Sequence, residues 1–198
     1  MEILEQEVSF EEIIKGSRFL SELIICETQA QAREIIKAQK TKYNDATHVC
    51  HAFITGTAGE VMGMSDDGEP SGTAGRPILD VLKGRGCTNV MLTVTRWFGG
   101  TLLGTGGLVK AYSGGAKSVI LKANELNAFV PLIEKKDFCF SVDYSSHKLV
   151  KKLMENYTLY NVTETFDTNV TLKGEIATSD FDSFAAMLLE HSKGKIKL

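Results

Sequence analysis

Hydrophobic and polar residues follow two different rhythms in the first third of the chain. The segment from Arg18 to Glu27 has the apolar character of a strand. Thr28 and Gln31 then form a capping box, which opens a helix with an apolar stripe at helical spacing. His48 to Ile54 and Glu60 to Met64 predict two further strands, because the loop between them has the composition of a hairpin. The pattern therefore predicts a strand, a helix and a hairpin, in that order.

The next segment predicts a short helix, a core strand and a long helix. The short helix is expected to begin at Pro77 and to stop at the two glycines that follow it. Alternation from Asn89 to Thr95 predicts the core strand. Gly114 and Gly115 interrupt the long helix at a cost of roughly 1 kcal/mol each, so close packing against the sheet is expected there. One face of that helix carries Leu108, Tyr112, Ala116, Val119, Ile120 and Ala123.

The last third of the chain predicts a strand, a helix, two strands, a helix and a final strand. Thr178 or Ser179 is the expected cap of the second of these helices, and residues 195–198 are the expected last strand. The order βαββαβ describes a ferredoxin-like domain. We therefore predict an α+β protein of two domains, residues 1–134 and residues 135–198, without a low-complexity linker.

Composition and charge favour a globular protein without membrane segments. The chain has 198 residues, 43% of them hydrophobic, so it is long and apolar enough to bury a core. Its net charge is -3. No apolar run reaches membrane-spanning length, and the acidic amino terminus lacks the features of a signal peptide. The expected location is cytoplasmic, with no membrane partner. The four cysteines form no Cys-x-x-Cys pair, so we predict four buried thiols and neither a metal nor another cofactor.

Fifteen of the eighteen glycines lie between Gly56 and Gly115, around two runs, Asp66 to Pro77 and Arg96 to Gly107. Glycine costs backbone entropy on folding, so such a concentration indicates sharp turns or close approaches. The segment from Arg76 to Lys122 also carries seven basic residues against one acidic residue, which would allow an anion to bind there. We therefore place the function in these two runs.

Carboxylates of the first run offer one chemistry. Asp66, Asp67 and Glu69 are close in sequence to Ser71 and Thr73, which is compatible with a divalent cation or an acid–base pair. Loop carboxylates also cap turns through hydrogen bonds, and this alternative is favoured.

A second candidate group lies on the first strand of the predicted hairpin, His48 to Ile54. Strand alternation places His48 and Cys50 on one face and His51 on the other. A core or edge role is therefore favoured over metal ligation.

The second run combines an arginine, two aromatic residues and a helix start. Arg96, Trp97 and Phe98 could stack on a base or grip a peptide, or Trp97 could brace the glycine loop from the core. The N–H groups that follow Gly104 could hold a phosphate, although neither the dinucleotide nor the P-loop pattern is complete and a tight turn is the alternative. The predicted binding residues are Asp67, Glu69, Ser71, Thr73, Arg76, Arg96, Trp97, Phe98, Gly99, Gly100, Gly104, Gly106, Gly107 and Lys110.

The two runs also carry a resemblance. Asp66 to Leu79 and Val94 to Tyr112 closely resemble the IMPACT/YigZ family, and so do the shorter blocks Lys15 to Phe19 and Ala46 to His48. The resemblance covers residues 15–123 closely and the remainder more loosely. It implies a first domain with the fold of a small-subunit ribosomal protein and of the last-but-one domain of elongation factor G. The second domain would resemble that factor's last domain.

Two hypotheses about function follow. In the first, the chain is a non-enzymatic protein with a role in the regulation of translation, which binds RNA, the ribosome or a protein partner of the translation machinery. Basic side chains and the amides from Gly104 to Gly107 would contact phosphate, and Trp97 or Phe98 would contact a base. In the second, it is a hydrolase or phosphotransferase that uses the Asp66 to Arg76 loop. We favour binding, because no complete set of nucleophile, base and orienting group is present.

Overall fold

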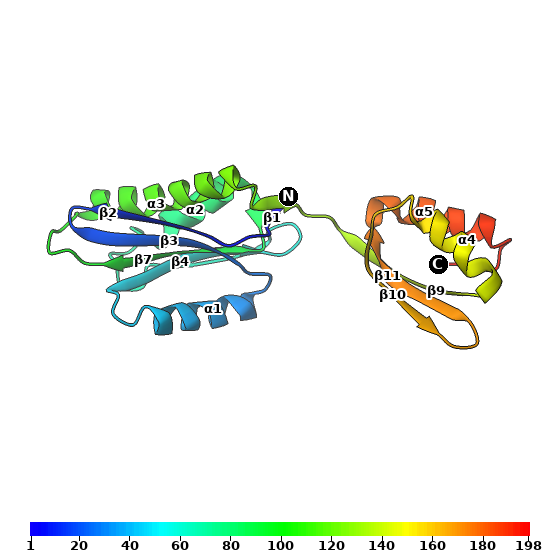
Figure 1. Ribbon diagram of the computed structural model, residues 1–198. Coiled ribbons are helices and arrows are strands. Elements are labelled where there is room, and N and C mark those ends of the chain that lie inside the picture. The colour runs from blue at the N-terminus through cyan, green and yellow to red at the C-terminus, as the bar shows by residue number, and fades with distance from the viewer. The chain divides into compact units, whose positions relative to one another are not determined.

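The computed structural model describes all residues, 1–198. Their contacts divide the chain into two compact units, Met1–Leu132 and Ile133–Leu198. The division predicted from the sequence lies between residues 134 and 135. Both units combine helices with sheets (Figure 1), so the α+β class is confirmed.

A five-stranded sheet forms the centre of the first unit, with strands in the order β2-β3-β7-β4-β5 and every neighbouring pair antiparallel. The strands are β2 Val8–Ile14, β3 Ser17–Ile25, β4 His48–Thr55, β5 Val61–Ser65 and β7 Val90–Trp97. The central strand β7 is buried on both faces from Val90 to Arg96. It extends two residues beyond the predicted end, so Arg96 and Trp97 lie inside the sheet rather than after it.

Helices cover both faces of this sheet (Figure 1). Helix α1, Gln29–Lys42, covers one face, while α2, Gly75–Arg85, and α3, Thr105–Glu125, cover the other. The cap of α1 is the predicted one, since the Thr28 side chain accepts the N–H of Gln31 at 3.1 Å. All six predicted core residues of α3 are buried. Helix α2 starts two residues earlier than predicted.

The two glycines within α3 have different surroundings. A Cβ on Gly115 would lie 2.6 Å from the Ser21 hydroxyl oxygen, whereas a Cβ on Gly114 would meet nothing within 4 Å. Close packing therefore explains Gly115, as expected, but not Gly114.

A second, three-stranded sheet closes one end of the first unit and was not predicted. Its strands are β1 Glu2–Leu4, β6 Cys87–Thr88 and β8 Phe129–Pro131. The first strand lies between the other two, parallel to β6 and antiparallel to β8. Such short strands leave little periodicity for sequence analysis to detect.

The second unit has the order βαββα. Its elements are β9 Lys135–Val142, α4 Tyr144–Met154, β10 Leu159–Phe166, β11 Val170–Ala177 and α5 Thr178–His191. The sheet order is β10-β11-β9, so the final strand predicted at residues 195–198 is wrong. Ile196 is nevertheless only 5% exposed and packs in the second core, which accounts for the alternating pattern without strand pairing. The cap of α5 is Ala177, rather than Thr178 or Ser179.

Three of the four cysteines are buried, and none forms a disulfide. Cys139 is exposed, contrary to the prediction, because it stands on β9 between Phe138 and Phe140, whose side chains fill the second core. None of the helices is long and apolar enough to cross a membrane.

Candidate functional site

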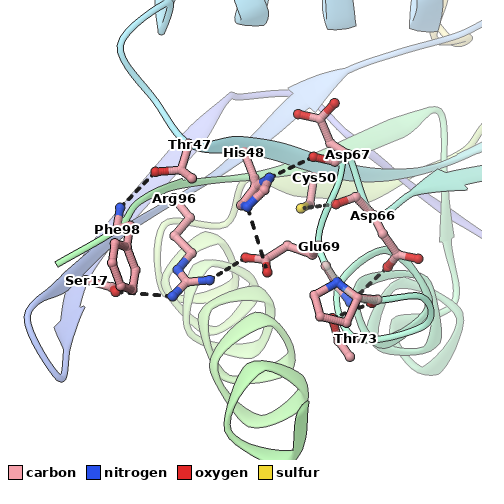
Figure 2. A network of polar contacts seen from close by, with 12 residues as sticks. Ser17, Thr47, His48, Cys50, Asp66, Asp67, Glu69, Thr73, Arg96 and Phe98 are labelled. Atoms are coloured by element: carbon pink, nitrogen blue, oxygen red, sulfur yellow. Dashed lines mark hydrogen bonds and ion pairs between the residues drawn. The ribbon is translucent and has the colours of Figure 1, made fainter. Parts of the chain in front are cut away.

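A buried carboxylate joins three elements of the first unit. The Glu69 Oε1 accepts hydrogen bonds from Arg96 Nη1 at 2.6 Å and from the Tyr112 hydroxyl at 2.7 Å. The Nε2 atom of His48 lies 3.9 Å from Glu69 Oε2 (Figure 2). Glu69 comes from the loop between β5 and α2, Arg96 from β7 and Tyr112 from α3. The two runs of glycines are thus linked by an ion pair that is shielded from water.

The Asp66 side chain binds backbone N–H groups in the loop before α2 and at the start of that helix. Its carboxylate accepts the N–H groups of Gly72 at 2.8 Å, Ala74 at 3.0 Å and Gly75 at 2.8 Å. The capping position of this helix, Ala74, has no side chain that could accept these bonds. Burial by itself raises the pKa of Asp66, but the three N–H groups outweigh burial and hold that pKa below its usual value.

Asp67 fastens the same loop to strand β4. Its Oδ2 accepts the N–H of Val49 at 2.7 Å, and its Oδ1 pairs with the Lys40 ammonium. Its carbonyl oxygen lies 2.8 Å from Nδ1 of His48 (Figure 2). The loop carboxylates therefore have structural partners, which argues against their use as free acid–base or metal-binding groups.

The predicted face separation on β4 is confirmed for His48, Cys50 and His51. Cys50 packs in the core with residues of α2 and α3, and its Sγ donates to the carbonyl oxygen of Asp66 at 3.0 Å. His51 lies on the face of Phe53, two residues further along the strand, which packs against Ala32 of α1. Burial raises the pKa of the Cys50 thiol to about 12, so this thiol is not a nucleophile at neutral pH. Burial also raises the pKa of Tyr112, which stays a neutral donor to Glu69.

The second run is anchored by two hydroxyl groups. The Ser17 hydroxyl oxygen accepts the N–H of Gly99 at 3.2 Å and Arg96 Nη2 at 3.4 Å. The Thr47 hydroxyl oxygen accepts the N–H of Phe98 at 3.0 Å (Figure 2). These bonds fix the chain as it leaves β7.

Arg96, Trp97 and Phe98 do not form one recognition surface. The Trp97 ring lies 5.5 Å from the Tyr43 ring and 4.2 Å from the Arg18 guanidinium, on the α1 side of the sheet. Arg96 points the other way, with its guanidinium carbon 5.5 Å from the Phe98 ring. Arg96 and Trp97 therefore cannot contact one ligand together, because successive strand residues face opposite sides of the sheet.

A cavity of about 480 Å³, here called the Glu69 cavity, opens above the ion pair. Glu69, His48 and Arg96 belong to its lining, together with the apolar residues Phe98 and Leu102. Phe98 is 46% exposed and Leu102 is 83% exposed. The cavity thus places apolar side chains that are open to solvent beside a buried ion pair.

The start of α3 borders the same cavity. Gly104 and Thr105 belong to the lining, and the first hydrogen bond of the helix runs from Leu108 N–H to the Gly104 carbonyl at 2.9 Å. The N–H groups of residues 105–107 precede this bond and have no acceptor within the helix. The Nε atom of Arg96 is buried and has no partner in the protein. Of residues 105–107 only Thr105 belongs to the lining, so a ligand with acceptor atoms in the cavity could use the Thr105 N–H together with Arg96 Nε.

The remaining predicted site residues lie outside the lining of the Glu69 cavity. Thr73 is buried and donates to the Pro70 carbonyl at 2.7 Å, a bond within the loop. Arg76 is exposed on α2 and pairs with Asp80 at 2.8 Å. The other predicted binding residues outside the lining are Asp67, Ser71, Gly99, Gly100, Gly106, Gly107 and Lys110.

Sequence reasoning did not select His48 or Tyr112 as site residues. His48 was assigned to the core or an edge, and Tyr112 to the apolar face of a helix. The available signal was the Tyr112 hydroxyl, because a buried phenol usually needs a hydrogen-bond partner.

Asp66→Asn is expected to make the first unit less stable and less sensitive to acid. Asn loses the charge that the three N–H groups favour, so we expect a loss of about 1–2 kcal/mol at pH 7. Because the folded pKa of Asp66 lies below its unfolded value, its contribution is present above the unfolded pKa and is lost as pH falls through the folded pKa. Urea unfolding between pH 7 and pH 3 should give a flatter profile for the variant. Asp45→Asn, at an exposed carboxylate, should keep the wild-type profile, and a wild-type acid response in Asp66→Asn would contradict the assignment.

Three of the known proteins to which this chain is similar carry the same family name. Residues 15–120 match the family model of the Impact N-terminal domain. A protein of Haemophilus influenzae named IMPACT family member is 36% identical over 96% of this chain and 91% of its own length. YigZ of Escherichia coli is 32% identical, over 96% of this chain and 93% of its own length. YvyE of Bacillus subtilis is 34% identical, over 92% and 82%.

One solved structure also matches over nearly the whole chain. It is described as the crystal structure of an hypothetical protein and is 30% identical. The match covers 98% of this chain and 93% of that chain, with a TM-score of 0.67.

Proposed function

This chain belongs to the IMPACT family, and on that premise we propose that it is a non-enzymatic cytoplasmic protein that acts in translation by binding RNA. The proposed binding site is the Glu69 cavity, which would receive one unpaired nucleotide of a single-stranded RNA segment, free or in the ribosome. The volume of about 480 Å³ lies within the range of small-ligand sites and suits a single base with its sugar.

One observation carries this proposal: exposed apolar side chains stand beside unused hydrogen-bond donors. Phe98 and Leu102 offer a flat ring and an aliphatic chain to a base. The N–H groups at the start of α3 suit a phosphate, since a helix N-terminus favours anions. Arg96 Nε, which is buried without a partner, offers one further donor to a base or sugar oxygen.

The geometry favours binding over catalysis. His48 has its Nδ1 atom beside a backbone carbonyl, and neither hydroxyl group of the lining, Thr47 or Thr105, makes a hydrogen bond to it. The nearby thiol of Cys50 is protonated at neutral pH, and Glu69 is occupied by Arg96 and Tyr112. The set of groups that a hydrolase requires is incomplete here.

Phe98→Ala is expected to weaken RNA binding about tenfold, since stacking of one base on an aromatic ring contributes roughly 1–3 kcal/mol. The probe is a fluorescein-labelled single-stranded RNA of about twelve nucleotides, which is long enough for phosphate contacts on both sides of one base. Fluorescence anisotropy with the full chain measures its affinity across a salt series. Binding should weaken as salt rises, because phosphate contacts release counterions. Co-sedimentation with ribosomal subunits then tests the same variants on the larger target.

Ile13→Ala is the matched control, because Ile13 is 72% exposed on edge strand β2 and lies outside the cavity. This variant should bind RNA like the wild type. Equal affinity of wild type and Phe98→Ala, or an affinity that salt does not change, would refute the proposal.

A further inference from the structure

A second, larger groove lies between α2 and α3, on the side of these helices that faces away from the sheet. Its volume is about 760 Å³. Helix α2 contributes Pro77 and Val81, and α3 contributes Val109 and Leu121. Leu121 is 61% exposed and Val109 is 38% exposed, so the lining offers apolar side chains to solvent. We call this feature the α2–α3 groove, and its lining shares no residue with that of the Glu69 cavity.

The shape of the groove fits a helix. Its α3 wall runs from Val109 to Asn124, which at 1.5 Å per residue corresponds to about 22 Å, or four helical turns. Small residues contribute to both walls, Gly84 on α2 and Ser113 on α3, and a Cβ on Gly84 would meet nothing within 4 Å. An apolar channel of this length between two helices is the geometry in which amphipathic helices bind.

The charges around the groove select the partner. Three basic residues, Arg76, Arg85 and Lys117, belong to the lining, together with one carboxylate, Asp80. Arg76 pairs with Asp80 and Arg85 pairs with Glu2, whereas Lys117 makes no ion pair and leaves its positive charge open to a partner. A partner segment with Asp and Glu along the borders of its apolar stripe would therefore meet opposite charge on binding.

The composition of the lining favours a protein partner over RNA. It contains aliphatic side chains and no aromatic ring on which a base could stack. The geometry points to a protein-docking site for an acidic amphipathic helix of about four turns. This site is separate from the Glu69 cavity, so the two can be tested independently.

Selection of peptides tests this inference. A phage library of random 16-residue peptides is selected on the immobilised full chain, with removal of phages that also bind Leu121→Asp. The enriched peptides should carry apolar residues at positions i, i+3 or i+4, and i+7, bordered by Asp and Glu. The best peptide, made synthetically, should bind wild type at least ten times more tightly than it binds Leu121→Asp or Lys117→Glu.

Charge exchange makes the test specific. Replacing the acidic residues of that peptide by lysine should abolish its binding to wild type and restore part of its binding to Lys117→Glu. Leu149→Asp and Lys148→Glu are matched controls on α4, where both side chains are exposed, and they should bind the acidic peptide like the wild type. Phe98→Ala should also bind the acidic peptide normally, which separates this site from the proposed RNA site.

Three results would overturn the inference. The first is that no peptide is enriched, and the second is that enriched peptides lack helical spacing or acidic residues. The third is that the single-stranded RNA probe, rather than the peptide, loses affinity in Lys117→Glu and Leu121→Asp, which would assign the groove to RNA.

Discussion

Glu69→Gln is expected to lower the free energy of unfolding of the first unit by about 3–5 kcal/mol, because it leaves the Arg96 charge buried without a counter-charge. Glu69 and Arg96 are both nearly inaccessible to water, and their contact is 2.6 Å long. Glutamine can still accept a hydrogen bond from Tyr112, so the expected loss arises mainly from the charge. The measurement is urea unfolding at pH 7, followed by the fluorescence of Trp97, the single tryptophan, which lies in the first unit.

Asp80→Asn is the matched control for this experiment. It removes the carboxylate of an exposed Arg–Asp pair on α2, where the two charged atoms are 2.8 Å apart. Exposed pairs of this kind contribute about 0.3–0.5 kcal/mol. The double variant Glu69→Leu with Arg96→Met removes both charges and should recover much of the stability. A cost of Glu69→Gln no larger than that of Asp80→Asn would show that the buried pair is unimportant for stability.

Gly99→Ala is expected to destabilise the first unit by about 3 kcal/mol, because the added methyl group has no room. A Cβ on Gly99 would lie 1.9 Å from the carbonyl carbon of Gly16 and 2.4 Å from the N atom of Ser17. Lys15 and Gly16 form the two-residue turn between β2 and β3, and both have positive φ, as type I′ hairpin turns require. This turn cannot move aside without loosening the hairpin.

The control for this substitution is Gly114→Ala. A Cβ at Gly114 meets nothing within 4 Å, and the residue lies inside α3, so this variant should be more stable than wild type by roughly 1 kcal/mol. Urea unfolding reports both values. Because Gly99 follows Phe98, we also expect the Gly99→Ala variant to bind the RNA probe more weakly. If Gly99→Ala were as stable as the wild type, the backbone at Gly16 and Ser17 would have to move away from the new methyl group without cost, which would contradict this prediction.

The elements that the sequence predicted well are those with local signals. The capping side chain of Thr28 and the apolar stripe of α3 act within one or two helical turns, so pattern and structure agree there. Local patterns failed where pairing decides the outcome. Residues 195–198 alternate like a strand, yet no neighbouring strand accepts them.

The candidate site could be predicted only in outline. The concentration of glycines located both loops, and Glu69, Arg96 and Phe98 do lie together. Sequence order could not reveal that Glu69 pairs with Arg96, 27 positions away, or with Tyr112, 43 positions away, because such contacts depend on the sheet order. The position of Trp97 depends on the length of β7. Because β7 extends two residues beyond its predicted end, the Trp97 ring faces α1 instead of the side of Arg96.

During synthesis, the first unit cannot complete its smaller sheet until Pro131 has emerged, because β1 lies between β6 and β8. A nascent chain that stops before β8 leaves Leu4, which is 2% exposed in the folded unit, without part of its cover. The core of the second unit draws only on residues after 132, so it forms later and separately. Synthesis from the amino terminus therefore leads to two folding steps in chain order. The first step ends when β8, at the end of the first unit, pairs with β1 at its beginning.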